Sequence, residues 1–172
     1  MSREAQLFAD IKTLGIAFEL WEHEAVFTVE ESSKLNRDIP GAHTKNLFLK
    51  DASGRFWLVA VPADARIDLK KLPSAIGSKK LSFGKANDMA RLLGVIPGSV
   101  TPLSVFHDVT NDVTVVLDAG LLLTEQVNVH PLRNTATIGL SPAYLIALLN
   151  HWRHNPVIAD IPVIDRDGYA EK

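Results

Sequence analysis

The sequence contains no cysteine, and this absence removes several kinds of chemistry at once. Without thiols there can be no disulfide, no thiolate nucleophile and no cysteine-ligated zinc or iron–sulfur site. The chain also lacks a GxSxG motif, a P-loop and a dinucleotide-binding glycine fingerprint. Among the six histidines only His151 and His154 have a ligand-like spacing, and no HExxH-type partner accompanies them. We therefore expect neither a metal nor a cofactor.

Long apolar runs and an excess of positive charge are missing as well. No run approaches the roughly 20 apolar residues that span a bilayer, and the first ten residues lack the apolar block of a signal peptide. Together with the missing disulfides, this predicts a cytoplasmic protein with no membrane partner. The formal net charge is −2, whereas proteins that bind long stretches of nucleic acid are strongly basic. Any contact with RNA should therefore be local.

What is present indicates one folded domain, since 172 residues with 47% hydrophobic side chains suffice for a single core. Helical patterns and β-prone runs alternate along the chain. The helical patterns cover 2–14, 28–39, 68–76, 85–93 and 142–152; the β-prone runs cover 17–21, 44–50, 55–61, 82–83, 113–117, 126–130 and 135–138. Because several strands are joined by hairpin-length links, we predict an α+β fold with a mixed, largely antiparallel sheet flanked by helices.

The domain should span residues 1–155. Residues 156–172 are rich in proline, glycine and charge, which predicts a loosely held C-terminal extension.

The first candidate for a functional site is Thr44-Lys45-Asn46, where a loop enters an apolar strand. Polar groups at the mouth of a buried strand are held by a rigid scaffold, which suits a binding site. Taken by itself, however, this pattern favours a strand-end lysine that extends its ammonium group to water.

Two further candidates are the Gly98-Ser99-Val100-Thr101-Pro102 loop and His130. Glycine lets a main chain approach a ligand closely, proline stiffens the loop, and exposed amides can bind an oxyanion or a carbonyl group. The simpler alternative is a connector between a helix and a strand. His130 follows the alternating Val127 and Val129 and thus lies at a strand end; the simpler alternative is a structural histidine.

Taken together, these features resemble a known family, the YbaK-like aminoacyl-tRNA editing superfamily, which includes the insertion domain of bacterial prolyl-tRNA synthetase. The residues that carry the resemblance are His23-Glu24, Thr28, the run from Thr44 to Asp51, the Gly98-x-x-x-Pro102 loop and His130. The resemblance covers roughly residues 1–155. Within the family, the chain looks closest to the free-standing branch called ProXp-ala or PrdX, which deacylates alanyl-tRNA(Pro).

The resemblance implies hydrolysis of the ester that joins a wrong amino acid to the terminal adenosine, without metal or covalent intermediate. It also implies a substrate site between the lysine strand and the GxxxP loop. In this site Lys45, Asn46 and His130 would be catalytic, and Thr44 with Gly98 to Pro102 would bind the substrate. The partners would be the acceptor end of tRNA(Pro) and prolyl-tRNA synthetase.

A lysine ammonium is cationic at neutral pH, so we expect Lys45 to anchor a phosphate or the ester oxygen electrostatically and not to act as a base. A second site that excludes proline by size would supply selectivity, with His130 as part of its wall. The tRNA body would meet a weak basic patch, for which a solvated face is the alternative. Its candidates are Lys70, Lys71, Lys79, Lys80, Lys85 and Arg91.

Two alternative functions stay open at this point. The first is a deacylase on the same scaffold that clears another small amino acid, as in Cys- or Ser-tRNA. A non-catalytic relative that binds tRNA or a synthetase is the other possibility, against which the intact Lys45 and GxxxP loop count.

Overall fold

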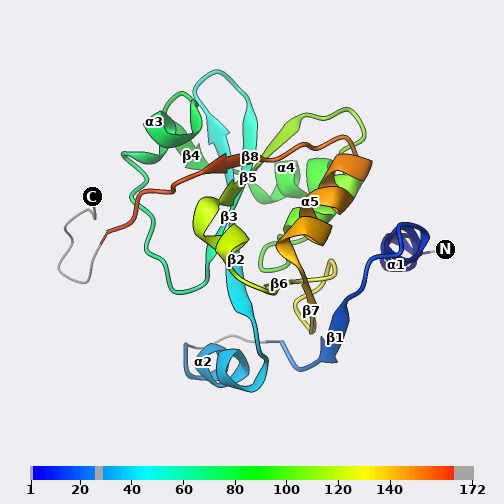
Figure 1. Cartoon of the computed structure of the whole chain (residues 1–172). Coiled ribbons are helices and arrows are strands. Elements are labelled where there is room, and N and C mark those ends of the chain that lie inside the picture. Colours follow the sequence, from blue (N-terminus) through cyan, green and yellow to red (C-terminus); the bar gives the residue numbers. More distant parts are fainter. Residues whose placement is uncertain (1, 26–28, 165–172) are drawn as a thin grey trace.

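A computed structural model of the chain describes residues 2–25 and 29–164 (Figure 1). The helices are α1 (Arg3–Thr13), α2 (Val29–Asp38), α3 (Leu72–Ile76), α4 (Ala86–Leu93) and α5 (Pro142–His151), with two 3₁₀ helices, η1 (Pro102–His107) and η2 (Ala119–Leu123). The strands are β1 (Glu19–Glu22), β2 (Ala42–Asp51), β3 (Phe56–Pro62), β4 (Leu81–Phe83), β5 (Val113–Asp118), β6 (Val127–Val129), β7 (Ala136–Leu140) and β8 (Val157–Ala159). The predicted start of the second helix, Thr28, lies outside the described residues.

The strands form one mixed sheet in the order β1-β7-β6-β2-β3-β5-β8, and β4 pairs with β2 beside this path. Four ladders are antiparallel: β1–β7, β6–β7, β2–β3 and β2–β4. Three are parallel: β2–β6, β3–β5 and β5–β8. The predicted fold class, a mixed and largely antiparallel sheet flanked by helices, is confirmed.

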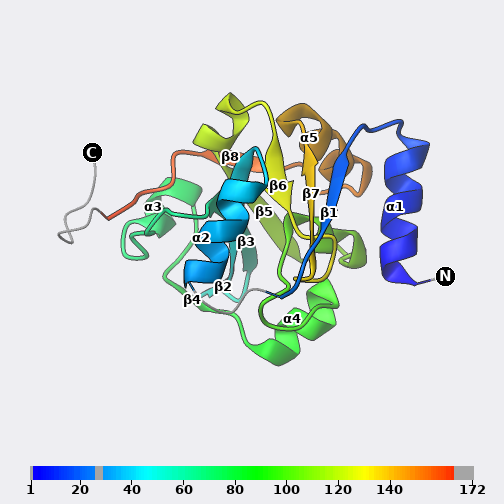
Figure 2. The ribbon, with the colours of Figure 1, turned by 90° about the horizontal axis from the view of Figure 1, so that it is seen from below.

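The central strand β3 is buried on both faces, as its unbroken apolar sequence requires. Phe56, Leu58 and Ala60 join the larger core, which also contains residues of α1, α4 and α5. Trp57, Val59 and Val61 join a smaller core that contains residues of α3. Figures 1 and 2 show α1 beside the β1 edge of the sheet and α2 near the start of β2.

The predicted β2–β3 hairpin is present, and the carboxylate of Asp51 organises its turn. Oδ1 accepts hydrogen bonds from the main-chain N–H groups of Ser53 (2.9 Å) and Arg55 (3.0 Å) and from the Ser53 hydroxyl (2.6 Å). Oδ2 accepts from Trp57 Nε1 (3.1 Å) and the Lys79 N–H (3.4 Å). Burial alone raises the pKa of Asp51, but these hydrogen bonds outweigh it and hold the pKa well below its usual range.

The C-terminal segment differs from the prediction. Val157–Ala159 forms β8, which pairs in parallel with β5, and Ile161 is buried in the smaller core. Farther along, Ile67 and Val163 form an isolated bridge. The segment predicted as a loose extension is therefore held to the domain up to residue 164, by the β8 ladder, by the buried side chain of Ile161 and by the bridge at Val163.

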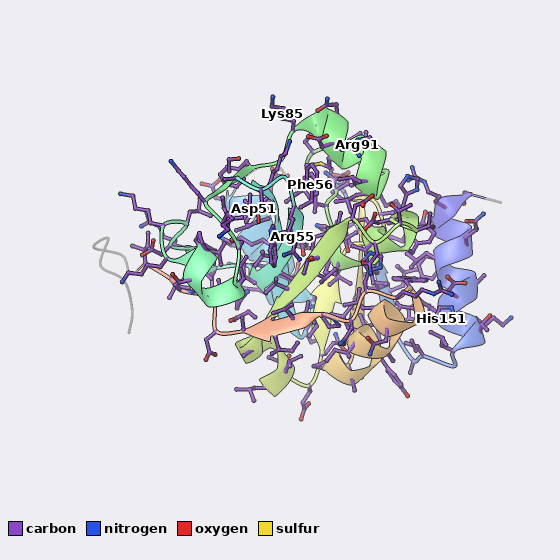
Figure 3. The ribbon with its side chains drawn as sticks, turned by 90° about the horizontal axis from the view of Figure 1, so that it is seen from above. Asp51, Arg55, Phe56, Lys85, Arg91 and His151 are labelled. Atoms are coloured by element: carbon purple, nitrogen blue, oxygen red, sulfur yellow. The ribbon has the colours of Figure 1, made fainter. Side chains whose placement is uncertain are left out.

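The two histidines with ligand-like spacing have different surroundings. His154 is buried, and its Nε2 lies 2.9 Å from Asp108 Oδ2, whereas His151 is exposed at the end of α5 (Figure 3). Burial alone raises the pKa of Asp108, but hydrogen bonds from His154, Val113 and Asp112 lower it below its ordinary value. Asp108, which His154 contacts, thus holds the start of β5 through the N–H of Val113 (2.8 Å). In the described part of the chain, no helix is both long enough and apolar enough to cross a membrane.

Candidate functional site

The edge of β2 that faces β6 and β4 has a gap in its pairing. At the start of the strand, Ala42 and His43 pair with β6; at its end, residues 49–51 pair with β4. Between these ladders, residues 44–48 have no strand partner on this edge among the described residues, while their other edge pairs with β3. An unpaired edge leaves main-chain donors and acceptors available. The predicted motif Thr44-Lys45-Asn46 lies in this gap.

The predicted GxxxP loop runs alongside the gap. Asn46 Nδ2 donates to the carbonyl oxygen of Val100 at 3.2 Å. Gly98 has a φ of 92°, in the left-handed region that glycine adopts without strain. A Cβ added there would meet nothing closer than Asn134 Nδ2 at 3.9 Å. The conformation, and not a lack of space, therefore requires this glycine.

The other loop residues hold the loop in place. Ser99, Thr101 and Pro102 are buried, and Thr101 caps η1, because its Oγ1 accepts from the N–H of Leu103 at 3.3 Å. Only Gly98 and Val100 of the predicted substrate-binding loop line a hollow. The remaining three are buried and line neither hollow, which sequence spacing could not distinguish from ligand contacts.

Asn46 has one satisfied and one unsatisfied polar atom. Its Oδ1 is buried and has no hydrogen-bond partner among the described residues. Leaving a buried acceptor unpaired costs about 1–3 kcal/mol, so such an atom calls for a functional explanation. The carbonyl oxygen of Phe48 accepts from the Gly84 N–H across this same edge (2.8 Å). By the two-residue repeat of a strand, the main-chain N–H of Asn46 also points into the gap.

Lys45 lines two hollows that meet at the gap. One has a volume of about 770 Å³; the other, about 340 Å³, follows the edge of β2 toward Phe83. Side chains from α2, β2, β6 and the segment after β3 bound the larger hollow, among them Ser33, Asn36, His43, Thr44, Asp64 and His130. No ion pair involves Lys45 in the parts of the chain that the structure describes.

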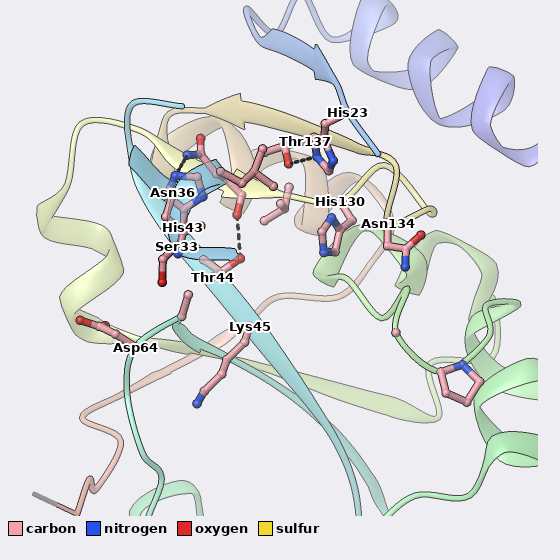
Figure 4. A pocket seen from close by; sticks show the side chains of 16 residues that line it. His23, Ser33, Asn36, His43, Thr44, Lys45, Asp64, His130, Asn134 and Thr137 are labelled. Atoms are coloured by element: carbon pink, nitrogen blue, oxygen red, sulfur yellow. Dashed lines mark hydrogen bonds between the residues drawn. The ribbon is translucent and has the colours of Figure 1, made fainter. Parts of the chain in front are cut away.

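Figure 4 shows the ammonium group of Lys45 extending away from His130 and Asn134, toward the side of the larger hollow where Asp64 lies. The predicted catalytic residues Lys45 and His130 therefore line the same hollow without facing each other.

His130 is a mostly buried, oriented imidazole. Its Nδ1 lies 3.2 Å from the carbonyl oxygen of Ala136, so we assign the proton to Nδ1, which leaves Nε2 as an acceptor. Burial lowers the pKa of His130, the bond to Ala136 partly opposes this, and the charge of His23 lowers the pKa further. His130 is thus neutral at neutral pH.

Several polar residues of the larger hollow were not among the predicted site residues. His23 Nε2 lies 2.9 Å from Thr137 Oγ1. Thr44 Oγ1 donates to the Asn128 carbonyl oxygen at 2.7 Å, and Asn128 Nδ2 donates to the carbonyl oxygen of Pro40 at 2.9 Å. Asn128 is only 2% exposed. The sequence signal that could have found it is an amide residue placed between two valines of an apolar strand.

The six predicted tRNA-binding residues are exposed, but they do not form one cluster by their contacts. Lys70 and Lys71 precede α3, and Lys79 and Lys80 precede β4. Figure 3 shows the other two, Lys85 and Arg91, along α4. Arg91 already forms an ion pair with Asp88 at 2.8 Å, so part of its charge is compensated.

Comparison with known proteins is consistent with this geometry. A family model described as an aminoacyl-tRNA editing domain matches residues 23–148. The prolyl-tRNA editing protein ProX of Acetoanaerobium sticklandii is 40% identical over 142 residues, which cover 82% of this chain and 87% of that protein. The mouse protein named prolyl-tRNA synthetase associated domain-containing protein 1 is 40% identical over 159 residues, with 90% and 94% coverage.

Solved structures agree at the level of the fold. A crystal structure described as a candidate trans-editing enzyme for prolyl-tRNA synthetase superposes with a TM-score of 0.70 and covers 94% of this chain and 98% of its own. Its sequence identity is 22%, so this likeness concerns the fold alone.

Proposed function

The chain belongs to the aminoacyl-tRNA editing domain family, and from this premise we propose that it is a free-standing hydrolase that deacylates mischarged tRNA(Pro). Its substrate would be alanyl-tRNA(Pro), and the scissile bond the ester between alanine and the terminal ribose. The relative from A. sticklandii is named a prolyl-tRNA editing protein, and this name supports the choice of tRNA(Pro) as the substrate tRNA. This chain covers 87% and 94% of the lengths of the two relatives named above, which supports action in trans on tRNA charged by prolyl-tRNA synthetase.

The observation that carries this proposal is the gap beside β2. It brings an uncompensated cation, Lys45, an unpaired buried acceptor, Asn46 Oδ1, and a neutral imidazole, His130, to the walls of connected hollows. This combination suits a substrate that carries a phosphate, an ammonium group and a carbonyl group.

Each group has a separate task in hydrolysis. Lys45 holds the terminal phosphate or the ester oxygen by charge. The Asn46 Oδ1 atom accepts a hydrogen bond from the substrate, and the main-chain N–H of Asn46 faces the oxygen that becomes negative in the transition state. Water adds to the carbonyl carbon, the bond from this carbon to the ribose oxygen breaks, and the ribose oxygen takes a proton. No protein nucleophile takes part.

Selectivity between alanine and proline would be steric. A synthetase pocket built for proline rejects a smaller side chain by only about 1–3 kcal/mol per missing methylene group. A second site that admits alanine and excludes the proline ring supplies the missing discrimination. His130 is oriented by its bond to Ala136, which suits it as a fixed wall.

A deacylation panel tests this proposal directly. Purified protein is incubated with tRNA charged with alanine, serine, cysteine or proline, and the remaining ester is measured over time. We expect rapid loss of alanine from tRNA(Pro) and no loss of proline. Faster hydrolysis of the cysteine or serine ester would assign the same site to another amino acid. Hydrolysis of none of them would overturn the enzymatic function.

A further inference from the structure

Phe83 is an aromatic residue that the site described above does not use. It ends β4, and 62% of its surface is exposed, although it lines the smaller hollow together with Lys45 and Gly98. Among the described residues, no other aromatic ring packs against it. A large exposed aromatic side chain at the rim of a polar site offers its ring as a stacking surface for a ligand.

The main chain fixes the position of Phe83. Phe83 pairs directly with Leu49, and the next N–H, that of Gly84, donates to the carbonyl oxygen of Phe48 at 2.8 Å. A Cβ on Gly84 would lie 2.3 Å from the Phe48 ring, so only glycine allows this approach. The main chain at Phe83 is therefore held in place, while the ring itself stays exposed.

Phe83 and Lys45 project from the same face of the sheet. Directly paired residues of antiparallel strands share a face, and so do residues two apart along one strand. Leu49, Leu47 and Lys45 thus share the face of Phe83. Four residues along β2 correspond to about 13 Å. If Lys45 holds the aminoacyl ester, Phe83 is far enough along β2 to contact the nucleotide that precedes the terminal adenosine.

The surroundings of Phe83 favour a nucleotide over an apolar protein partner. Lys85 follows two residues later, is exposed, and takes part in no ion pair among the described residues. A nucleic-acid backbone that runs from Lys45 past Phe83 would thus meet a second cation, Lys85. Proteins that hold single strands combine such cations with aromatic rings on which bases stack, whatever the base.

We propose that Phe83 is the stacking platform for the nucleotide that precedes the terminal adenosine of the tRNA. This inference rests on the proposed function. The single-stranded 3′ end runs along the open edge of β2, with its penultimate base on the Phe83 ring. Lys85 neutralises the phosphate beyond this base.

The test compares two substrates, alanyl-tRNA(Pro) and the alanyl ester of adenosine alone. Phe83→Ala and Phe83→Leu should lower kcat/KM on the tRNA about 5- to 150-fold, mainly through KM, because one base stack is lost. The adenosine ester should react at the wild-type rate, and Phe83→Trp should retain activity on both. Equal losses on both substrates, or no loss on the tRNA, would overturn the proposal.

Two controls make the result specific. Leu123→Ala removes another exposed large apolar side chain, which lines neither hollow, and it should leave the reaction of both substrates unaffected. If the wild-type protein hydrolyses no ester, the proposed function fails, and stacking is then judged by binding alone. An uncharged 3′-end oligonucleotide with 2-aminopurine in the penultimate position should show quenching that Phe83→Ala abolishes. Equal quenching by both proteins would overturn the platform.

Discussion

Two parts of β2, its hairpin end and the gap at residues 44–48, which we call the gap end, use polar residues in opposite ways. At the hairpin end, Asp51 accepts five hydrogen bonds, and its side chain is only 5% exposed. At the gap end, six and five residues earlier, Lys45 has no described ion-pair partner and Asn46 has a buried oxygen without a donor. The same strand thus has a saturated polar centre at its hairpin turn and an unsaturated one in the gap.

This difference distinguishes a residue that stabilises the fold from residues that are available to bind a ligand. A saturated buried carboxylate stabilises the turn and has no capacity left for a substrate. An unsaturated cluster gives up stability in the free protein, and this loss is recovered only when a ligand supplies the missing partners. Substitutions at the two ends should therefore have opposite effects on activity and on folding.

The largest effect is expected from Lys45→Ala. Loss of the anchoring cation should lower kcat/KM for alanyl-tRNA(Pro) by about 100- to 1,000-fold, as for loss of one electrostatic contact to a transition state. The free energy of unfolding should change by less than about 0.5 kcal/mol, because no described ion pair is lost.

Deacylation kinetics and urea unfolding measure these two quantities. Lys12→Ala, at an exposed lysine of α1, is the matched control and should change neither. Near-normal turnover by a folded Lys45→Ala protein would remove Lys45 from the proposed mechanism.

Asp51→Ala should show the reverse pattern. Five donors would lose their acceptor, which we expect to lower the free energy of unfolding by about 2–4 kcal/mol, while the folded fraction keeps its kcat/KM. Because the folded-state pKa of Asp51 is depressed, its contribution is present above the unfolded pKa of about 3.9 and is lost as pH falls below it. In Asp51→Asn, the free energy of unfolding should therefore fall less steeply than in the wild type as the pH is lowered through the acid range. A large loss of activity in folded Asp51→Asn would contradict the division between the two ends.

The hairpin end was predictable from the sequence, and the gap end was predictable only in part. Asp51-Ala52-Ser53-Gly54 lies between two apolar runs, so the turn is a local signal. The gap arises because β6 and β4, which are distant in sequence, each cover one part of the edge of β2. Local sequence patterns carry no information about which part of a strand's edge a distant strand will pair with.

The same distinction explains the individual residues. Lys45, Asn46 and His130 were candidates from local patterns, the family resemblance implied their catalytic roles, and all three line the hollows. Ser99 and Thr101 share the motif with Gly98, but burial assigns them to support of the loop. Whether a loop side chain faces the core or a ligand depends on tertiary packing, and motif spacing does not record it.

His130→Ala should have a smaller effect, on selectivity. Removing the ring would widen the hollow, so the ratio of kcat/KM for alanine over proline should fall about 10-fold or more. His130→Phe keeps the bulk and should keep most of the selectivity. Because burial lowers the pKa of His130, its ring should stay neutral, and wild-type selectivity should persist, to a lower pH than for an ordinary histidine. If His130→Ala rejects prolyl-tRNA as firmly as the wild type, His130 is not part of the sieve.

The smallest effect is expected from charge reversal at Lys79 and Lys80, and it asks whether the hairpin end also contacts RNA. Asp51 accepts from the main-chain N–H of Lys79, so Lys79→Glu with Lys80→Glu leaves the turn intact and changes only exposed charge. If these lysines touch phosphates, KM for alanyl-tRNA(Pro) should rise a few-fold and depend less on salt. The adenosine ester should react unchanged. Unaltered KM and salt dependence would leave the Asp51 end with a purely structural role, and the comparison between the two ends would then be complete.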